Sequence, residues 1–350
     1  MNAEPPERVS LGVLGERGLI RRIAQSPAVL PRAPGVEVGL GDDTAVLTVP
    51  PGHKLLATTD LLIEDVHFRR VSAAPADIGW KAMAVNLSDI AAMGGTPRWA
   101  LVALAVPAET DVEAVDAFYA GMAEAAAPHG VSVVGGDTAA SPSGWTVNVT
   151  LFGIHPGAPR LRSQARAGDA VMVTGGLGAA AAGLHVLEMG LDRARAAGMS
   201  GAGLAELTRA HLRPQARVAE GRWLGQAPGV HAMIDCSDGL ATDLGHICRE
   251  SGVGARVELG RVPVAAAARD AARILGADPH RWAVSGGEDY ELLLTCDPAA
   301  VDRLIAGLAA ATGTPLTMVG RIEGPPGEVA FVDAAGASAT MPSGFEHFHG

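Results

Sequence analysis

Hydrophobic and polar positions divide the first half of the chain into alternating strand-like and helix-like segments. Apolar runs predict strands over residues 38–49, 54–62, 99–106, 131–134 and 145–154, and helices are predicted over 15–24, 75–93 and 111–128. The turn Pro50-Pro51-Gly52-His53 separates the first two strands and predicts that they form a β-hairpin. After the short first helix, the order ββαβαββ indicates helices on one face of a mainly antiparallel sheet, an α+β layer.

A turn-rich stretch at 155–159 marks the expected domain boundary, and a mixed pattern follows it. Strands are predicted over 170–174, 231–234, 255–259, 290–295 and 317–322, with helices over 204–211, 215–224 and 239–250 and an Ala-rich helix after a glycine turn near 175–178. A chain of 350 residues suits two domains. We therefore expect an α+β protein with an N-terminal ββαβαββ-type domain over 1–154 and a mixed α/β C-terminal domain over 155–350.

The charge balance restricts the partners and the chemistry. Lys and Arg total 27 against 38 Asp and Glu, a formal net charge of −11. Such a surface repels nucleic acid and anionic membranes, so we expect neither as a partner. Lys54 and Lys81 are the only lysines in the sequence. Any phosphate chemistry must therefore depend on arginine, backbone N–H groups or metal ions.

Cysteine usage and the N-terminal sequence indicate a cytoplasmic protein. Cys236, Cys248 and Cys296 show no Cys-x-x-Cys spacing, as expected of reduced packing thiols. The N-terminal MNAEPPER has acids and prolines where a signal peptide needs basic and then apolar residues. The longest apolar stretch, 171–191, is interrupted by polar residues and is a weak candidate for a membrane span.

Acidic residues gather in six short loops beside Gly, Ser or Thr, mostly at strand ends or strand-to-helix turns. They are Gly41-Asp42-Asp43-Thr44, Thr58-Thr59-Asp60, Asn86-Leu87-Ser88-Asp89, Gly135-Gly136-Asp137-Thr138, Asp235-Cys236-Ser237-Asp238-Gly239 and Gly286-Gly287-Glu288-Asp289. One such loop alone is more typical of a solvated turn or helix cap. Six of one type favour carboxylates that converge on Mg²⁺ ions and substrate phosphates.

A glycine-rich turn follows the predicted strand 170–174. Gly176-x-Gly178-x-x-Ala181 loosely matches a dinucleotide-binding fingerprint, but the acid expected after a second strand is missing. A close-packed strand-to-helix turn, with a phosphate as a candidate ligand of its amides, is the better interpretation. No G-x-x-x-x-G-K-[ST] loop and no G-x-S-x-G elbow occur in the sequence.

Taken in order, these motifs resemble the thiamine-monophosphate kinase family. The resemblance rests on the acidic loops, on His67-Phe68, on the run from Ala84 to Gly94 and on Ser285-Gly286-Gly287-Glu288-Asp289-Tyr290-Glu291-Leu292, and it extends from about Gly12 to Phe348. The family belongs to the superfamily of aminoimidazole ribonucleotide synthetase and selenophosphate synthetase. The resemblance implies ATP-dependent phosphorylation of thiamine monophosphate to thiamine diphosphate, a homodimer formed through strands of the N-terminal domain, and an active-site cleft between the two domains.

The resemblance also implies a role for individual residues. Several Mg²⁺ ions would be held by Asp43, Thr58, Thr59, Asp60, Asp89, Asp137, Asp235 and Asp238. ATP would contact Gly136, Asp137, Arg162 and Ser237, and thiamine monophosphate would contact His67, Glu288 and Phe345. No catalytic side chain is expected, because the acceptor phosphate has a second pKa near 6 and is already ionised at pH 7.

Some features depart from the family or leave an alternative open. Pro342 stands where the family often has an aromatic residue, and Phe345 stands where tyrosine is common. Selenophosphate synthetase is disfavoured because all three cysteines lie beyond position 235, and aminoimidazole ribonucleotide synthetase is disfavoured by the segment 285–291. The remaining alternative is a non-catalytic nucleotide- or metal-binding regulator, although every acidic motif is intact.

Overall fold

The computed structural model describes residues 9–342 and 344 and divides into two compact units. The first unit contains the chain up to Asn86 together with Pro97–Gly157, and the second contains Leu87–Thr96 and the chain from Ala158. The N-terminal domain expected from the sequence, 1–154, includes residues 87–96, which belong here to the second unit. In the structure this segment packs against Gly221 and Gly225, where an added Cβ would lie 2.2 Å from Ala91 O and 2.7 Å from Gly94 Cα.

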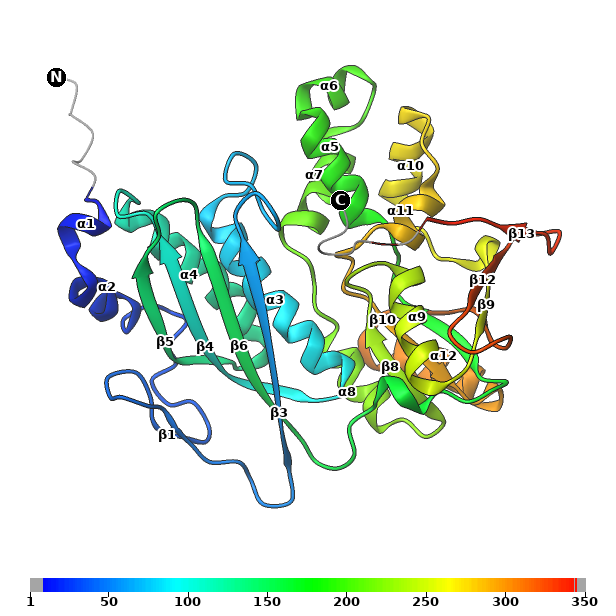
Figure 1. Ribbon diagram of the computed structural model, residues 1–350, viewed down its shortest axis with the longest axis horizontal. Coiled ribbons are helices and arrows are strands. Elements are labelled where there is room, and N and C mark those ends of the chain that lie inside the picture. Colours follow the sequence, from blue (N-terminus) through cyan, green and yellow to red (C-terminus); the bar gives the residue numbers. More distant parts are fainter. Residues whose placement is uncertain (1–8, 343, 345–350) are drawn as a thin grey trace. The chain divides into compact units, whose positions relative to one another are not determined.

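The first unit contains a four-stranded sheet, a two-stranded sheet and the helices that accompany them (Figure 1). Its elements are α1 (Leu11–Leu14), α2 (Glu16–Ile23), β1 (Val36–Val38), β2 (Val46–Leu47), β3 (Lys54–Ile63), α3 (Pro75–Ala92), β4 (Thr96–Val106), α4 (Val112–Ala126), the 3₁₀ helix η1 (Ala127–His129), β5 (Ser132–Ala140) and β6 (Thr146–His155). The last residues of α3, from Leu87 on, belong to the second unit. The larger sheet has the order β3-β6-β4-β5. The α+β architecture is confirmed, and β4 and β5 run parallel while β3 and β6 run antiparallel.

The predicted hairpin between residues 38–49 and 54–62 is wrong. Strands β1 and β2 pair with each other in a separate sheet, with Val36 opposite Leu47. Strand β3 instead pairs along its whole length with β6, from Lys54 opposite His155 to Ile63 opposite Thr146. The Pro-Pro-Gly turn therefore reverses the chain without pairing the strands on its two sides.

Two glycines set the close approach of helices α3 and α4. A Cβ added to Gly79 would lie 1.9 Å from Phe118 O, and one added to Gly121 would lie 1.8 Å from Ala76 O. Backbone groups cannot move away cheaply, so the crossing requires glycine on both helices. Helix α3 is buried along most of its length, which explains why apolar residues lie on all its sides, and Lys81, Asn86 and Ser88 are buried among them.

The second unit contains a seven-stranded mixed sheet with helices packed against it (Figure 1). After the 3₁₀ helix η2 (Arg162–Gln164), its helices are α5 (Ala179–Met189), α6 (Leu191–Ala196), α7 (Gly201–Leu212), α8 (Val218–Gln226), α9 (Leu240–Ser251), α10 (Ala266–Leu275), α11 (Pro279–Ser285) and α12 (Val301–Thr312), with 3₁₀ turns η3 (Leu259–Arg261) and η4 (Pro298–Ala300). Its strands are β7 (Ala170–Thr174), β8 (Val230–Asp235), β9 (Ala255–Glu258), β10 (Leu292–Cys296), β11 (Leu316–Ile322), β12 (Val329–Val332) and β13 (Ser338–Ala339).

Strand β7 lies inside the sheet order β13-β12-β9-β11-β7-β10-β8. All five of its residues are buried, and it pairs antiparallel with both β10 and β11. A strand that is covered on both faces has no polar face, which accounts for the uninterrupted apolar run Ala170-Val171-Met172-Val173. The loop after β7 and the segment before β10 lie at one end of this core.

No helix within the described residues is both long and apolar enough to cross a membrane. The apolar stretch 171–191 is instead divided between strand β7 and helix α5, with a glycine turn between them.

Candidate active site

Apart from Asp43, the predicted metal residues of the first unit lie on the two outer strands of its larger sheet. Thr58, Thr59 and Asp60 lie on β3, whereas Gly136 and Asp137 lie on β5. Two strands separate β3 from β5, so their backbones are roughly 14 Å apart at about 4.8 Å per strand. One ion cannot span that distance, and these residues would have to serve different ions or different phosphate oxygens.

The β5 site depends on glycine. Gly136 has a φ of 154°, and a Cβ added to it would lie 1.9 Å from Val102 O on the neighbouring strand. Asp137 follows directly, and its Oδ1 accepts the backbone N–H of Thr138 at 2.9 Å. This bond uses one carboxylate oxygen of an exposed side chain and fixes its direction.

On β3, the Thr59 hydroxyl takes part in a polar group with β6. Its Oγ1 lies 3.0 Å from Thr150 Oγ1 and accepts the Asn148 amide at 2.9 Å. The loop that follows β3 holds His67, whose Nδ1 accepts the backbone N–H of Ile63 at 3.1 Å. The tautomer of His67 that fits this bond carries its proton on Nε2. Asp43 is exposed, and its N–H donates to Asp42 Oδ1 at 2.8 Å.

The second unit brings the end of helix α3 to the end of strand β8. Ser88 Oγ donates to Asp235 Oδ2 at 2.6 Å, and both residues are buried. Burial, followed by the charge of Asp89, raises the pKa of Asp235 to about 7, while the bond from Ser88 and the charge of Arg162 act in the opposite direction. The predicted residues Asp89, Asp235 and Arg162 therefore act on one another electrostatically.

Asp243 is a buried acid of this site that the sequence reasoning missed. It lies in the first turn of α9, is 1% exposed, and its Oδ2 accepts the backbone N–H of Asp238 at 3.2 Å. Burial and the charges of Asp235 and Asp238 raise its pKa well above the ordinary value. Its only signal in the sequence is the acid five residues after Asp238, and sequence alone does not show that it is buried.

The loop after β8 is held by backbone bonds to the segment before β10. Ser237 O accepts the N–H of Glu288 at 2.8 Å, and Cys236 O accepts the N–H of Tyr290 at 2.9 Å. Glu288 and Tyr290 both have positive φ values, of 68° and 51°. Residues other than glycine rarely adopt this conformation, and such strain gathers at functional sites. A predicted ATP contact, Ser237, and a predicted substrate contact, Glu288, are thus neighbours.

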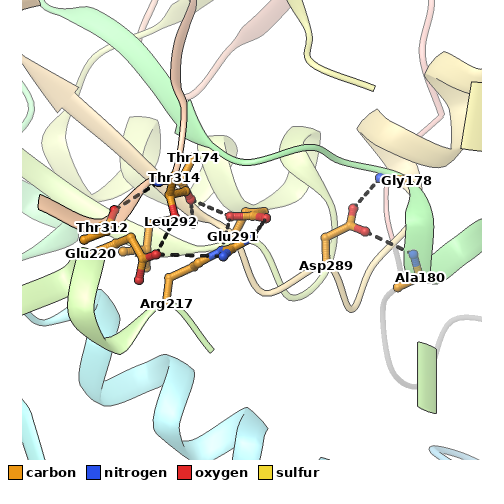
Figure 2. Close-up of polar contacts among 10 residues, drawn as sticks. All are labelled: Thr174, Gly178, Ala180, Arg217, Glu220, Asp289, Glu291, Leu292, Thr312 and Thr314. Atoms are coloured by element: carbon orange, nitrogen blue, oxygen red, sulfur yellow. Dashed lines mark hydrogen bonds and ion pairs between the residues drawn. The ribbon is translucent and has the colours of Figure 1, made fainter. Parts of the chain in front are cut away.

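Asp289 caps helix α5 from inside the protein. Its Oδ2 accepts the N–H of Gly178 at 2.6 Å and its Oδ1 accepts the N–H of Ala180 at 3.2 Å (Figure 2). The helix N-terminus attracts anions, and here a carboxyl group of the same chain takes that place. The suggestion that this turn faces a phosphate is therefore wrong for these two amides, since Asp289 occupies them.

We expect the Asp289 carboxyl to make stability depend on pH. Burial raises its pKa to about 7 from an ordinary value near 4. Between pH 4 and 7 the folded protein therefore keeps a proton that the unfolded chain has lost, so this group's contribution to stability falls as the pH rises. Relative to Asp289→Asn, which does not titrate, wild type should lose stability through this window by at most about 1.4 kcal/mol per pH unit.

Thermal unfolding of wild type and Asp289→Asn at half-unit steps from pH 4 to 8 measures this difference. Groups that titrate in both proteins cancel when the two curves are subtracted. A difference that stays constant with pH would contradict the elevated pKa of Asp289.

Glu291 forms a buried ion pair with Arg217. The guanidinium donates to both carboxylate oxygens, Nε to Oε2 at 2.7 Å and Nη2 to Oε1 at 2.6 Å, and Thr174 Oγ1 also donates to Oε2 (Figure 2). Glu220 lies 3.8 Å from Arg217 Nη1 and accepts the hydroxyl of Thr314. Glu291 is 4% exposed, so this network links β7, α8 and β10 inside the protein.

The C-terminal segment returns to the same region of the second unit. Pro342 O accepts the Ser285 hydroxyl at 2.6 Å, and the Gly344 N–H donates to Thr242 Oγ1 at 3.1 Å. A Cβ added to Gly344 would lie 1.9 Å from Asp238 O. Phe345 itself lies outside the described residues.

A complete metal site of protein ligands is not preformed. Across residues 9–342 and 344, no group of three or more His, Cys, Asp or Glu side chains is placed to hold a metal ion. The donor chemistry nevertheless suits Mg²⁺, because the site offers carboxylate and hydroxyl oxygens and the mutual repulsion of Asp89, Asp235 and Asp243 would be relieved by a cation.

Comparison with known proteins decides the family. Residues 41–155 match the model described as AIR synthase related protein, N-terminal domain, and residues 166–333 match AIR synthase related protein, C-terminal domain. The thiamine-monophosphate kinase of Rhodopirellula baltica is 37% identical over 323 residues, which are 90% of this chain and 92% of that protein. The chain belongs to the thiamine-monophosphate kinase family.

Solved structures of this family have the same fold. Thiamine-monophosphate kinase from Stenotrophomonas maltophilia superimposes with a TM-score of 0.78 at 36% identity, covering 91% of this chain and 95% of that one. AaThiL complexed with AMPPCP and TMP gives a TM-score of 0.74 at 32% identity, covering 97% of this chain and 99% of that one. The kinase family assignment and the two-domain α+β fold that the sequence motifs predicted are confirmed.

Proposed function

We propose that the protein transfers the γ-phosphate of ATP to thiamine monophosphate and so forms thiamine diphosphate. The observation that carries this proposal is the similarity to AaThiL complexed with AMPPCP and TMP over 97% of the chain. Thiamine-monophosphate kinases from several bacteria, at 34–40% identity over most of their length, support the same activity.

Mg²⁺ would neutralise the negative charge of the substrate phosphates, for which this acidic protein has few cationic side chains. The oxygen ligands that we propose are Asp43, Thr58, Thr59, Asp60 and Asp137 in the first unit, and Asp89, Asp235 and Asp238 in the second. Mg²⁺ in proteins is commonly bound by one or two carboxylates, with water and substrate phosphates completing its six ligands. The absence of a preformed three-residue group among the described residues agrees with that mode of binding.

The nucleotide and the acceptor would be bound by backbone and side-chain groups of the residues that the motifs single out. We assign Gly136, Asp137, Arg162 and Ser237 to ATP. His67, Glu288 and Phe345 are assigned to thiamine monophosphate. The negative charge of Glu288 would attract the cationic ring of this substrate. No side chain needs to act as general base, because the attacking phosphate oxygen is already ionised.

Exposed apolar side chains lie on an edge strand of the first unit. Strand β3 is an edge strand, and Leu55, Leu61 and Ile63 on it are 52%, 48% and 37% exposed. An edge strand with exposed apolar side chains is ready to pair with another chain. We propose a cytoplasmic homodimer formed through this sheet.

The activity is tested directly with purified protein, ATP, Mg²⁺ and thiamine monophosphate. We expect stoichiometric formation of thiamine diphosphate and ADP, and full loss of turnover when EDTA removes the metal. Aminoimidazole ribonucleotide precursors and selenide with ATP are the control reactions of the wider superfamily. Turnover of either, without thiamine diphosphate formation, would refute the proposal.

A further inference from the structure

The carboxylate of Glu288 lies against the imidazole of His211 inside the protein. Nδ1 of His211, in the last turn of α7, lies 3.0 Å from Oε2 of Glu288. The His211 side chain is 8% exposed and the Glu288 side chain is 27% exposed. The histidine is therefore an interior group, and the carboxylate is the end of the pair that solvent or a ligand can reach.

The backbone of His211 is held in place by the contact between α5 and α7. A Cβ added to Gly183 on α5 would lie 2.1 Å from Leu207 O and 3.1 Å from His211 Cβ. The two helices are thus as close as a glycine allows, and α7 cannot shift toward α5. The backbone that carries the imidazole is therefore held in one position relative to α5.

The backbone of Glu288 is equally fixed. Its φ of 68° and its N–H bond to Ser237 O at 2.8 Å define its conformation. Asp289 is bonded to the N-terminus of α5, and Glu291 is bonded to Arg217. With the backbone held on both sides, the direction of the Glu288 carboxylate depends on the contacts of its side chain.

We propose that His211 is a positioning residue that orients the Glu288 carboxylate toward the cationic part of the substrate. This inference rests on the proposed function, in which Glu288 contacts thiamine monophosphate. His211 engages one carboxylate oxygen, Oε2, and so sets where the other oxygen points. A neutral imidazole at this position leaves the negative charge of the carboxylate in place, whereas a lysine or arginine would neutralise it.

Three substitutions separate this role from a structural one. His211→Asn places an amide donor near the position of Nδ1, His211→Gln places it near the position of Nε2, and His211→Leu removes it. We expect His211→Leu and His211→Gln to raise the KM for thiamine monophosphate about tenfold, the usual effect of losing one polar contact to a charged group. The KM for ATP should change less than about twofold, and His211→Asn should keep both values near wild type.

A double-mutant cycle with Glu288→Gln shows whether the effect acts through Glu288. On that background, His211→Gln should raise the KM for thiamine monophosphate by less than about twofold further. If His211→Leu fails to fold, the comparison of the two amide variants still decides the question, because both are polar and differ only in where the amide lies.

Crystal structures of His211→Asn and His211→Gln without substrate provide a readout that needs no activity. The Glu288 carboxylate should keep its direction in His211→Asn and turn away in His211→Gln. An unmoved carboxylate in both, equal rises in both KM values, or equal behaviour of the two variants would overturn the inference. A wild-type enzyme that forms no thiamine diphosphate would refute the proposed function instead. The comparison of the two crystal structures would still test whether His211 orients the Glu288 carboxylate.

Discussion

Replacing Asp137 with Asn should lower kcat at least about 100-fold while leaving the melting temperature unchanged. Mg²⁺ bound to a transferring phosphate is worth several kcal/mol of transition-state stabilisation, and about 1.4 kcal/mol corresponds to a tenfold change in rate. Asn keeps the Oδ1 that accepts the Thr138 N–H, so the local fold should survive the loss of charge. Steady-state kinetics over a range of Mg²⁺ concentrations, with a melting curve, measure both effects.

Asp116 provides the matched control. It is also an exposed acid of the first unit, and it pairs with Arg22 on the surface. Asp116→Asn should change kcat less than about twofold, because exposed ion pairs contribute little. Asp43→Asn and Asp89→Asn test the same metal hypothesis from other loops. Near-normal turnover in all three ligand variants, with unchanged melting, would refute it.

Arg217→Met should destabilise the protein by about 3–5 kcal/mol, the usual loss when one partner of a buried ion pair is removed. Glu291 would keep its buried position and its bond from Thr174 but lose both bonds from the guanidinium. Burial already raises the pKa of Glu291 despite the nearby arginine. Chemical denaturation monitored by far-ultraviolet circular dichroism measures the change in the free energy of unfolding.

Two further variants define the origin of that loss. Arg195→Met removes an arginine from an exposed pair with Asp192 and should cost less than about 1 kcal/mol. Adding Glu291→Gln to Arg217→Met removes the buried charge and should restore a substantial part of the stability. A loss in Arg217→Met no larger than that in Arg195→Met would show that the buried pair does not stabilise the fold.

The sequence predicted those parts of the fold that depend on local patterns. The apolar run 170–174 is strand β7 with the predicted bounds, and the Pro and Gly signals bracketed helix α3 to within one residue. The hairpin failed because a turn sequence reverses the chain but does not choose the partner strand. The partner of β3 is β6, and Thr59 pairs with Thr150 across 91 positions of sequence.

The candidate site likewise contains residues that the sequence could reveal and residues that it could not. The acidic loops could be found because Asp beside Gly is visible in one sequence, and the family comparison supplied their proposed roles. Asp243, His211 and Arg217 could not be found, since their importance arises from burial and from contacts with distant residues. Nor could the sequence show that Asp289 faces inward to helix α5.

The segment Ser285–Leu292 combines residues that stabilise the fold with a residue proposed to bind the substrate. Asp289 and Glu291 fasten the segment to α5 and to Arg217, and Glu288 between Ser237 and His211 is the acid with a reachable carboxylate. Asp289 and Glu291 therefore stabilise the fold, and their role does not depend on which acceptor is phosphorylated. Attempts to alter acceptor specificity should vary position 288 together with position 211, and leave positions 289 and 291 as they are.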